Sequence, residues 1–388
     1  MRPPAVQLFP ASEYADRLAG VRARMQQRGI DMLLVHTPEN IFYLSGYQTP
    51  GYYWHMALAV PLEGEPVFIP PPHEASLIEQ YCWVEDVRLF PDTSDPVEAT
   101  VATLKDRNLS KGRIGVETRS WFLTSNYHSR LAGMLTEAKV SDGSGIVDAG
   151  RLIKSSGEIE YMRQAARHSE AGMQAGIDAA AAGETELDVA AAVHTALDLA
   201  GSEYSGLPAF ITSGPRSQLV HATWSRREIQ PSEPVFLEIP GVVNRYHAAH
   251  SRSVFTGRPT DQLIKADETN RAALATAKVA MRPGVPAREV FRAARRVIDD
   301  ADVGYRQGRR IAYGIGIAFP PGWDEGHIFS INSDELRPLE EGMTFHLITT
   351  MRIQGLGAIG CSDTVLVTAT GVETLTAAVP PGVVIKES

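Results

Sequence analysis

The stretch of residues 233–257, EPVFLEIPGVVNRYHAAHSRSVFTG, decides the fold of the second half of the chain. Its apolar run Val235–Ile239 predicts a buried strand, and the pair Pro240–Gly241 predicts a turn. The residues after the pair predict a returning strand that ends at Phe255. A carboxylate, Glu238, lies inside the first apolar run. We therefore expect an antiparallel hairpin with a charged side chain in its buried part.

Glu238 needs either a partner or a function, because an unpaired buried carboxylate is costly or changes its pKa. One interpretation is a structural ion pair with Arg252 on the second strand. The other is a catalytic group, since acids with perturbed pKa values concentrate at functional sites. His247 and His250 are three residues apart on the same strand, so at most one of them faces such a site.

Composition and charge indicate an ordinary soluble globular protein. The chain has 388 residues, 44% hydrophobic and 21% charged, and is long enough for two domains. A net charge of −9 without a basic patch argues against nucleic acid as a partner. Two cysteines are too few for a disulfide framework or a thiolate metal site. No membrane-spanning run or signal-peptide core is visible, so we expect a cytoplasmic protein without a membrane partner.

The first half, residues 1–152, alternates strands with helices, which predicts an α/β domain. Ser12 is the expected cap of the first helix, and Thr37–Glu39 the expected turn after the first strand. An aromatic loop follows, with Tyr53, Trp54 and His55. Clustered aromatic side chains of this kind indicate a binding edge if they are exposed. Packing of the same rings beneath the loop is the alternative.

The second half, residues 153–388, predicts an α+β domain with helices flanking a mostly antiparallel sheet. Ser156 is the expected cap of its first long helix, and Thr185 with Asp188 has the spacing of a capping box. The expected helices cover residues 156–182, 185–199, 267–281 and 286–302. The expected final strands cover residues 342–353 and 362–371.

The order of motifs resembles the creatinase/prolidase/methionine aminopeptidase group, which has the pita-bread fold. The resemblance rests on RLIKSSGEIEYMRQAARHSEAGM, LVHATW, RYHAAHSRSVFTGRP, YGIGI, LEEGMTF and SDTVLV. The first half resembles the smaller N-terminal domain of prolidases and creatinase. The resemblance covers nearly the whole chain, and it implies an α/β domain, a pita-bread catalytic domain with a curved sheet, and a homodimer.

The metallopeptidases of this group hold two metal ions with two Asp, one His and two Glu, and this sequence differs at each position. The five positions carry Glu238, Ala249, Tyr313, Ile348 and Ser362. Hard divalent metals need several oxygen ligands, so one glutamate cannot hold a metal pair. The nearby histidines have no known ligand spacing. The resemblance therefore predicts an enzyme without a metal or other cofactor.

Metal-free members of the group, creatinase and ectoine hydrolase, hydrolyse carbon–nitrogen bonds at an amidine-type carbon. His221, in LVHATW, falls at the position of the family's catalytic histidine. Creatinase's further glutamates and its carboxylate-binding arginine fall on Ser251, Ile348 and Trp54. The chain is more similar to ectoine hydrolase, in FLEIPG, RYHxxxSRxVF, FPPGWDEG, GMTFHL and the Tyr53–His55 pair.

We therefore expect hydrolysis of a non-peptide C–N bond in a small amidine-type substrate by activated water. Glu238 and His221 are the predicted catalytic residues, with Glu238 as the candidate base and His221 as a second proton-transfer group. The predicted substrate-binding residues are Arg252, Asp363, Trp224, Trp323, Tyr313, Tyr53, Trp54, His55, His247, His250 and His346. Arg252 suits a substrate carboxylate, or else it pairs with Glu238 or Asp363.

Structural alternatives accompany these roles. His346 fits a core histidine, Asp363 a structural cap or ion pair, and Trp323 a loop plug. The alternative functions are a creatinase-like amidinohydrolase, an Xaa-Pro aminopeptidase-like peptidase, and an inactive binding protein with a pocket filled by bulky side chains. An open pocket where His221, Glu238 and Arg252 converge would favour the enzyme, because buried polar groups are costly to keep in a sealed pocket.

Overall fold

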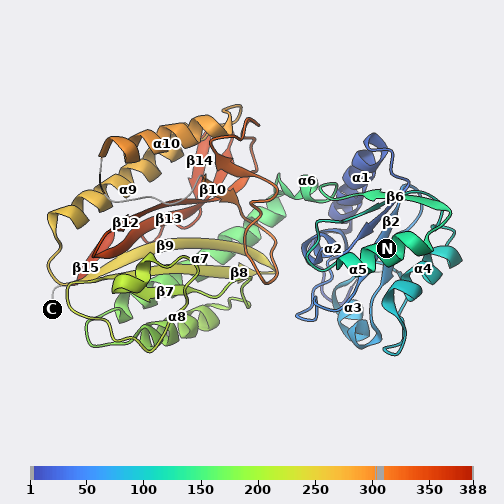
Figure 1. The fold of residues 1–388 in the computed structure, drawn as a ribbon, viewed down its shortest axis with the longest axis horizontal. Helices are drawn as coiled ribbons and strands as arrows, with labels where there is room; N and C mark the ends of the chain where they lie inside the picture. Colours follow the sequence, from blue (N-terminus) through green and yellow to red (C-terminus); the bar gives the residue numbers. More distant parts are fainter. Residues whose placement is uncertain (1–3, 302, 304–309, 387–388) are drawn as a thin grey trace. The chain divides into compact units, whose positions relative to one another are not determined.

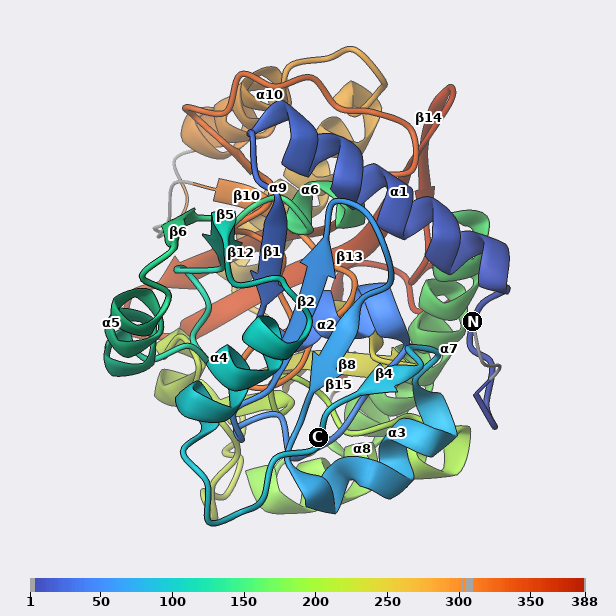
Figure 2. The ribbon, with the colours of Figure 1, turned by 90° about the vertical axis from the view of Figure 1, so that its right-hand side faces the viewer.

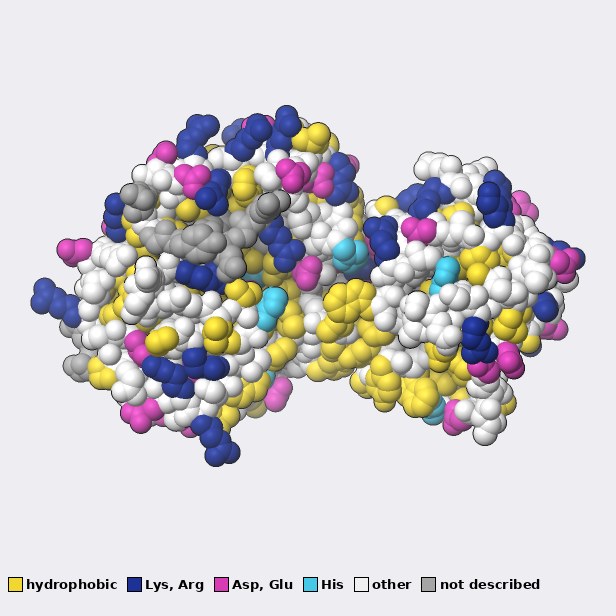
Figure 3. All heavy atoms as spheres, viewed as in Figure 1, with side chains coloured by type: hydrophobic (Ala, Val, Ile, Leu, Met, Phe, Trp, Pro, Cys, Tyr) yellow, Lys and Arg dark blue, Asp and Glu magenta, His cyan; other side chains and the backbone are white. Residues whose placement is uncertain are grey.

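The chain folds into two compact units, residues 1–151 and 152–388, in a computed structural model that describes residues 4–301, 303 and 310–386 (Figure 1). The sequence predicted a boundary after residue 152. Each unit has its own sheet and hydrophobic core. No helix in the described ranges is long and apolar enough to cross a membrane. On the face in Figure 3, positive and negative side chains are interspersed over both units.

The N-terminal unit is built on a six-stranded mixed sheet in the order β4-β3-β2-β1-β5-β6. Its strands are β1 (Met32–Val35), β2 (Ala57–Pro61), β3 (Val67–Ile69), β4 (Asp86–Val87), β5 (Gly112–Val116) and β6 (Ala138–Asp142). Its helices are α1 (Ala11–Gln27), α2 (Pro38–Ser45), η1 (Pro72–Glu74), α3 (Ala75–Tyr81), α4 (Pro96–Asp106), α5 (Ser125–Met134) and α6 (Asp148–Arg151). Helices α4 and α5 bury their apolar side chains against one face of this sheet (Figure 2).

Two local predictions in this unit are wrong. The expected turn at Thr37–Glu39 is the start of helix α2, with Pro38 at its first position and Gly46 in a left-handed conformation at its end. That pair of signals is typical of a short helix. Ser12 lies inside α1, whose cap position is Pro10.

The C-terminal unit is built on a nine-stranded sheet. Seven strands follow the order β11-β10-β12-β13-β9-β8-β7, while β14 pairs with β13 and β15 with β9. The strands are β7 (Phe210–Ser213), β8 (Pro234–Val243), β9 (Tyr246–Thr256), β10 (Arg310–Gly314), β11 (Ser330–Asn332), β12 (Thr344–Ile353), β13 (Gly357–Thr368), β14 (Gly371–Thr374) and β15 (Val383–Lys386). The helices are α7 (Ser156–Ala179), α8 (Glu186–Ala200), η2 (Gly214–Gln218), α9 (Asp261–Ala280) and α10 (Ala287–Ala301). All of these strand pairs except β9–β15 are antiparallel, as predicted.

The first two helices of this unit start within one residue of their predicted starts, whereas α9 starts earlier. Ser155, one residue before the predicted cap, forms a capping box with Glu158 at the start of α7. Thr185 and Asp188 form the predicted box at α8. Helix α9 starts six residues before its predicted start, because Thr260 caps it by accepting a bond from the Leu263 amide at 3.2 Å. The predicted end of the last helix, Asp302, lies outside the described residues.

The hairpin of β8 and β9 turns four residues later than predicted. Asn244 and Arg245 form the turn with φ of 47° and 64°, a backbone conformation that two-residue hairpin turns require. The Glu203 carboxylate accepts bonds from both turn amides, at 2.7 and 3.1 Å. Pro240 and Gly241 therefore continue β8 rather than end it.

Gly241 is required by the close approach of α7 to the hairpin. A Cβ atom at this position would overlap the Ala165 carbonyl oxygen and lie 2.5 Å from the Ser169 amide nitrogen. Both are helix backbone atoms, which cannot rotate away. We expect Gly241→Ala to lower the free energy of unfolding by about 3 kcal/mol in urea titrations. Gly371→Ala, where nothing lies within 4 Å, should change it by less than about 0.5 kcal/mol. Equal effects of the two variants would contradict this packing argument.

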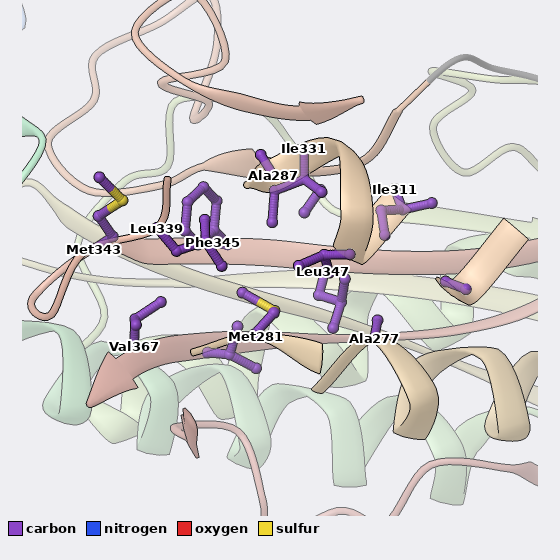
Figure 4. Close-up of a cluster of buried hydrophobic side chains, with 14 of the residues drawn as sticks. Ala277, Met281, Ala287, Ile311, Ile331, Leu339, Met343, Phe345, Leu347 and Val367 are labelled. Atoms are coloured by element: carbon purple, nitrogen blue, oxygen red, sulfur yellow. The ribbon is translucent and has the colours of Figure 1, made fainter. Parts of the chain in front are cut away.

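All four long helices of this unit pack on one face of its sheet. Residues of β8 and β9 that face α7 and α8 include Val235, Leu237 and Val254, and the odd-numbered residues of β12 and β13 face α9 and α10 (Figure 4). Because side chains alternate along a strand, the residues between them point to the other face. We call that other face the front face. It carries Glu238, Ser251, Ser362, His346 and Tyr313.

Candidate functional site

A carboxyl and two hydroxyls lie in one row across the front face. Glu238 on β8 is directly opposite Ser251 on β9, and Ser251 is directly opposite Ser362 on β13. Side chains directly opposite each other share a face and lie with Cβ atoms about 5 Å apart. The Glu238 side chain is 14% exposed, and both serines are buried. The row therefore has one end that solvent can reach.

A hydrogen-bonded chain runs from Trp323 to this row. The Trp323 indole donates to the Tyr313 hydroxyl at 2.9 Å, and that hydroxyl lies 2.7 Å from His346 Nδ1. His346 Nε2 lies 2.6 Å from Ser362 Oγ, which also accepts a bond from the Ser251 amide at 2.7 Å. We call the three central groups the Tyr313–His346–Ser362 chain. Through these hydrogen bonds, the predicted site residues Trp323, Tyr313 and His346 are connected to the row.

The Glu238 carboxyl has the pKa of a group that can exchange protons near neutrality. Burial raises its pKa from 4.5 to about 7. Its one ionisable neighbour within ion-pair distance in the described chain is His346, with 3.8 Å between Oε1 and Nδ1. That ring is neutral, because burial lowers the pKa of His346 to about 3. Among the described residues, no cation lies within ion-pair distance of Glu238 at neutral pH, which favours acid–base chemistry at this carboxyl.

Phe210 connects the other predicted catalytic residue to the row. His221 is exposed, with a φ of 60° that is uncommon outside glycine, and its ring centroid is 5.7 Å from that of Phe210. Phe210 lies directly opposite Glu238 on β7, and its ring is 5.6 Å from Trp323. Sequence reasoning missed Phe210. The sequence feature that could have indicated Phe210 is an aromatic residue in a short apolar strand just before the loop of His221.

Arg252 and Asp363 lie on the helix side of the sheet, not on the front face. Arg252 donates to Asp363 at 2.8 Å, and Lys278 of α9 lies 2.6 Å from the other Asp363 oxygen. The guanidinium also donates to the carbonyls of Ser251 and Ser362, at 2.7 Å each. The geometry contradicts the predicted contacts with substrate. The structural alternative, an ion pair of Arg252 with Asp363, is what the structure has.

The two histidines of β9 point to opposite faces, as expected from their spacing, and both have structural partners. His247 accepts a bond from the Gly206 amide at 2.9 Å through Nε2, and its Nδ1 lies 3.0 Å from the Arg245 carbonyl. His250 lies on the helix side, 2.8 Å from the Ser169 hydroxyl. Neither geometry supports the predicted contact with substrate.

The remaining predicted binding residues are Trp224 of the C-terminal unit and three residues of the N-terminal unit. Trp224 packs against His194 of α8 on the helix side, with ring centroids 5.0 Å apart, which contradicts its predicted place at the site. In the N-terminal unit, Tyr53 and Trp54 are exposed, and their tilted rings have centroids 6.0 Å apart. His55 is buried there, 3.2 Å from Thr100 of α4, so it does not join the exposed pair.

The five positions that the resemblance assigns to metal ligands do not form a dinuclear metal site. Glu238 supplies the one carboxylate of the set, beside an alanine, an isoleucine, a tyrosine and a serine. Both ring nitrogens of His346 already lie within hydrogen-bond distance of hydroxyls. In the described residues, no group of three or more His, Cys, Asp or Glu side chains has the geometry to hold a metal ion. The donor set does not fit a metal pair.

Comparisons with known proteins show the family to which the chain belongs. Residues 160–369 match metallopeptidase family M24, and residues 17–153 match the creatinase/prolidase N-terminal domain. The chain therefore belongs to the M24 family of hydrolases. It is similar to ectoine hydrolase of Halomonas elongata, with 30% identity over 386 residues, covering 95% of this chain and 96% of that protein. It is 27% identical to an Xaa-Pro dipeptidase of Lactobacillus delbrueckii over 355 residues, covering 91% and 94% of the two chains.

Solved structures confirm the predicted fold. A prolidase from Thermococcus sibiricus superposes with a TM-score of 0.85 at 21% identity, covering 97% of this chain and all of that chain. The X-Pro aminopeptidase from Thermotoga maritima gives 0.83 at 21% identity, covering 95% and 99%. At this identity the likeness defines the two-domain pita-bread architecture alone.

Proposed function

We propose that this protein is a metal-independent hydrolase that opens a small cyclic amidine of the ectoine type. The observation that carries the proposal is Glu238, a carboxyl of raised pKa, at a family metal-ligand position whose companion ligands are replaced. The similarity to ectoine hydrolase over nearly the whole chain supports the substrate class. The predicted homodimer and cytoplasmic location stay predictions.

Glu238 acts as the general base in this proposal. Its carboxylate takes a proton from water, the water oxygen attacks the amidine carbon, and one carbon–nitrogen bond of the ring breaks. A base with a pKa of about 7 is suited to this role, because it is largely ionised above neutrality yet still basic. His221 is the candidate second proton-transfer group, next to Phe210. The Phe210 face suits a delocalised cation.

Arg310 replaces Arg252 as the candidate group for a substrate carboxylate. It is exposed at the start of β10, where a shift in register precedes Ala312, and its guanidinium lies 4.6 Å from the Tyr313 ring centroid. Its charge also lowers the pKa of His346, after burial, so it acts on the site. An exposed guanidinium beside the site matches a carboxylate in shape and charge.

We expect Arg310→Met to raise KM for a cyclic amidine carboxylate about tenfold or more, with kcat within a few-fold of wild type. The reason is that a charged hydrogen bond contributes about 1.5–3 kcal/mol to binding. Steady-state kinetics measure this change. Arg292→Met, which removes an exposed arginine paired with Glu289 on α10, is the matched control and should leave KM unchanged. An unchanged KM in Arg310→Met would remove this residue from the site.

The proposed function is tested by incubating the purified protein with ectoine and following proton NMR. Ring-opened acetyl-diaminobutyrate is the expected product. Creatine and Xaa-Pro dipeptides, offered in parallel, test the amidinohydrolase and peptidase alternatives. Because the chain is related to an Xaa-Pro dipeptidase, peptide hydrolysis is an alternative that this experiment has to test. Turnover of the dipeptides alone would overturn the proposal, and no turnover of any of them would favour the inactive binding protein.

A further inference from the structure

The Tyr313–His346–Ser362 chain holds one more hydrogen than its two internal bonds use. A neutral tyrosine, a neutral histidine and a serine bring three movable hydrogens, and each internal bond takes one. The outer partners, the Trp323 indole and the Ser251 amide, are donors that cannot accept. The third hydrogen therefore points out of the chain, from Ser362 at one end or from Tyr313 at the other.

The chemistry of the two ends decides where this hydrogen lies at rest. A phenol is more acidic than a serine hydroxyl and is the stronger donor to an imidazole nitrogen. Tyr313 therefore donates to His346 Nδ1 across 2.7 Å, and His346 Nε2–H donates to Ser362 across 2.6 Å. The Ser362 hydroxyl then keeps its own hydrogen free to point along the front face.

A second observation marks the same place as a ligand contact. The Ser251 hydroxyl is buried next to Ser362 and has no hydrogen-bond partner in the described part of the chain. Buried hydroxyls are nearly always bonded, so an exception needs an explanation. Two hydroxyls with bonding capacity to spare thus lie in the row that starts at Glu238.

We infer that Ser362 is the catalytic proton donor to the departing nitrogen, and that His346 and Tyr313 are positioning residues that resupply its proton. The inference rests on the proposed hydrolysis and deepens it. It gives the two halves of the reaction to two ends of one row, and it assigns to Ser362 the proton transfer for which His221 was the candidate. Glu238 takes the proton of the attacking water, and Ser362 gives one to the leaving group.

The proposed transfer conserves protons. As the carbon–nitrogen bond breaks, its electron pair goes to nitrogen, which takes the Ser362 hydroxyl proton. Ser362 Oγ then takes the Nε2 proton of His346, and Nδ1 takes the Tyr313 phenol proton. The Tyr313 oxygen, to which the Trp323 indole donates, regains a proton from water, and Glu238 releases to water the proton that it took. Exchange with solvent after product release, one proton in at Ser362 and one out at Tyr313, restores the resting arrangement.

Nitrogen NMR of histidine-labelled protein tests the resting arrangement without any turnover. His346, assigned by its loss in His346→Gln, is expected to be neutral from pH 6 to 8 and protonated on Nε2. A ring protonated on Nδ1 or on both nitrogens would overturn the inference, because the Ser362 hydrogen would then be bonded to the ring or the chain would carry a charge. This result is independent of whether ectoine is the substrate.

Kinetics in mixtures of light and heavy water test the transfer itself. Ser362→Ala and Tyr313→Phe are each expected to lower kcat by about a hundredfold with KM within twofold. The wild-type rate should depend on the deuterium fraction in a curved way, which shows several protons in flight, and Tyr313→Phe should make it linear. Ser253→Ala is the matched control, because this buried serine of β9 bonds to the backbone of Gly360 in the neighbouring strand β13 and lies outside the proposed relay. Its kcat and curvature should match wild type.

The outcomes separate the two proposals. The relay would be overturned if the wild-type rate depended linearly on the deuterium fraction, or if Ser362→Ala had the kcat of wild type. Either result would leave the hydrolase proposal in place. Absence of wild-type turnover with the expected His346 tautomer would overturn the proposed substrate and leave the hydrogen-bond arrangement in place.

Discussion

Glu238→Gln is expected to lower kcat for amidine hydrolysis by about a thousandfold, with KM changed by less than about threefold. Glutamine keeps the size of the side chain but cannot take a proton from water, and general base catalysis contributes about 10²–10⁴-fold. Steady-state NMR assays at pH 8 measure the loss. In wild type, kcat/KM should rise with pH to a plateau, with an apparent pKa of about 7, because only the ionised carboxyl is a base.

Glu238→Gln lowers the activity, but it is expected to raise the free energy of unfolding above neutral pH. Burial raises the native pKa of Glu238 from 4.5 to about 7, so the native state holds a proton that the unfolded state has released between these pH values. The stability that protonation contributes is present below about pH 4.5 and is lost as pH rises through 7. Glu238→Gln should therefore be about 3 kcal/mol more stable than wild type at pH 8, and equal to it at pH 4. Wild-type kcat in this variant, or lower stability at pH 8, would contradict the assigned role.

Asp363→Ala is expected to lower the free energy of unfolding by about 3–5 kcal/mol. The change leaves Arg252 and Lys278 without their shared carboxylate, at 2.8 and 2.6 Å, on the helix side of the sheet. Removing one member of a buried ion cluster leaves the other charges without a counter-ion in a poorly solvated environment. Urea unfolding at neutral pH measures the loss, and the kcat of the folded variant should stay within a few-fold of wild type.

The control for this prediction is an exposed ion pair of the same unit. Asp299→Ala breaks an i, i+4 pair with Arg295 on α10 and should cost less than about 1 kcal/mol. A large rise in KM for Asp363→Ala with unchanged stability would instead show that Asp363 binds substrate.

The alternation of side chains along β8 and β9 already held the information that separates Arg252 from Glu238. A two-residue turn pairs residues whose numbers sum to an odd value, whether it lies at Pro240–Gly241 or at Asn244–Arg245. Glu238 thus shares its face with odd-numbered residues of β9, such as Ser251, and Arg252 points the other way. The sequence-based prediction placed Arg252 at the site because its guanidinium suits a carboxylate, and it did not apply this alternation to Arg252.

Other parts of the site depend on contacts that no local pattern encodes. The Tyr313–His346–Ser362 chain joins three different strands, and its bonds follow from the register of β10, β12 and β13. His346 fits the expected core histidine in burial, yet its two partners make it part of the candidate site. The turn at Asn244–Arg245 was hidden by the stronger turn signal of Pro240 and Gly241, which close packing against α7 explains instead.

The most direct test of the central claim is the rate of ectoine hydrolysis by protein stripped of metal with a chelator and verified by elemental analysis. The account predicts a kcat within twofold of the untreated protein and no stimulation by added Mn²⁺, Co²⁺ or Zn²⁺, because Glu238 activates the water. Loss of activity on stripping, restored by one of these ions, would contradict it and return the protein to the metal-dependent chemistry of its peptidase relatives.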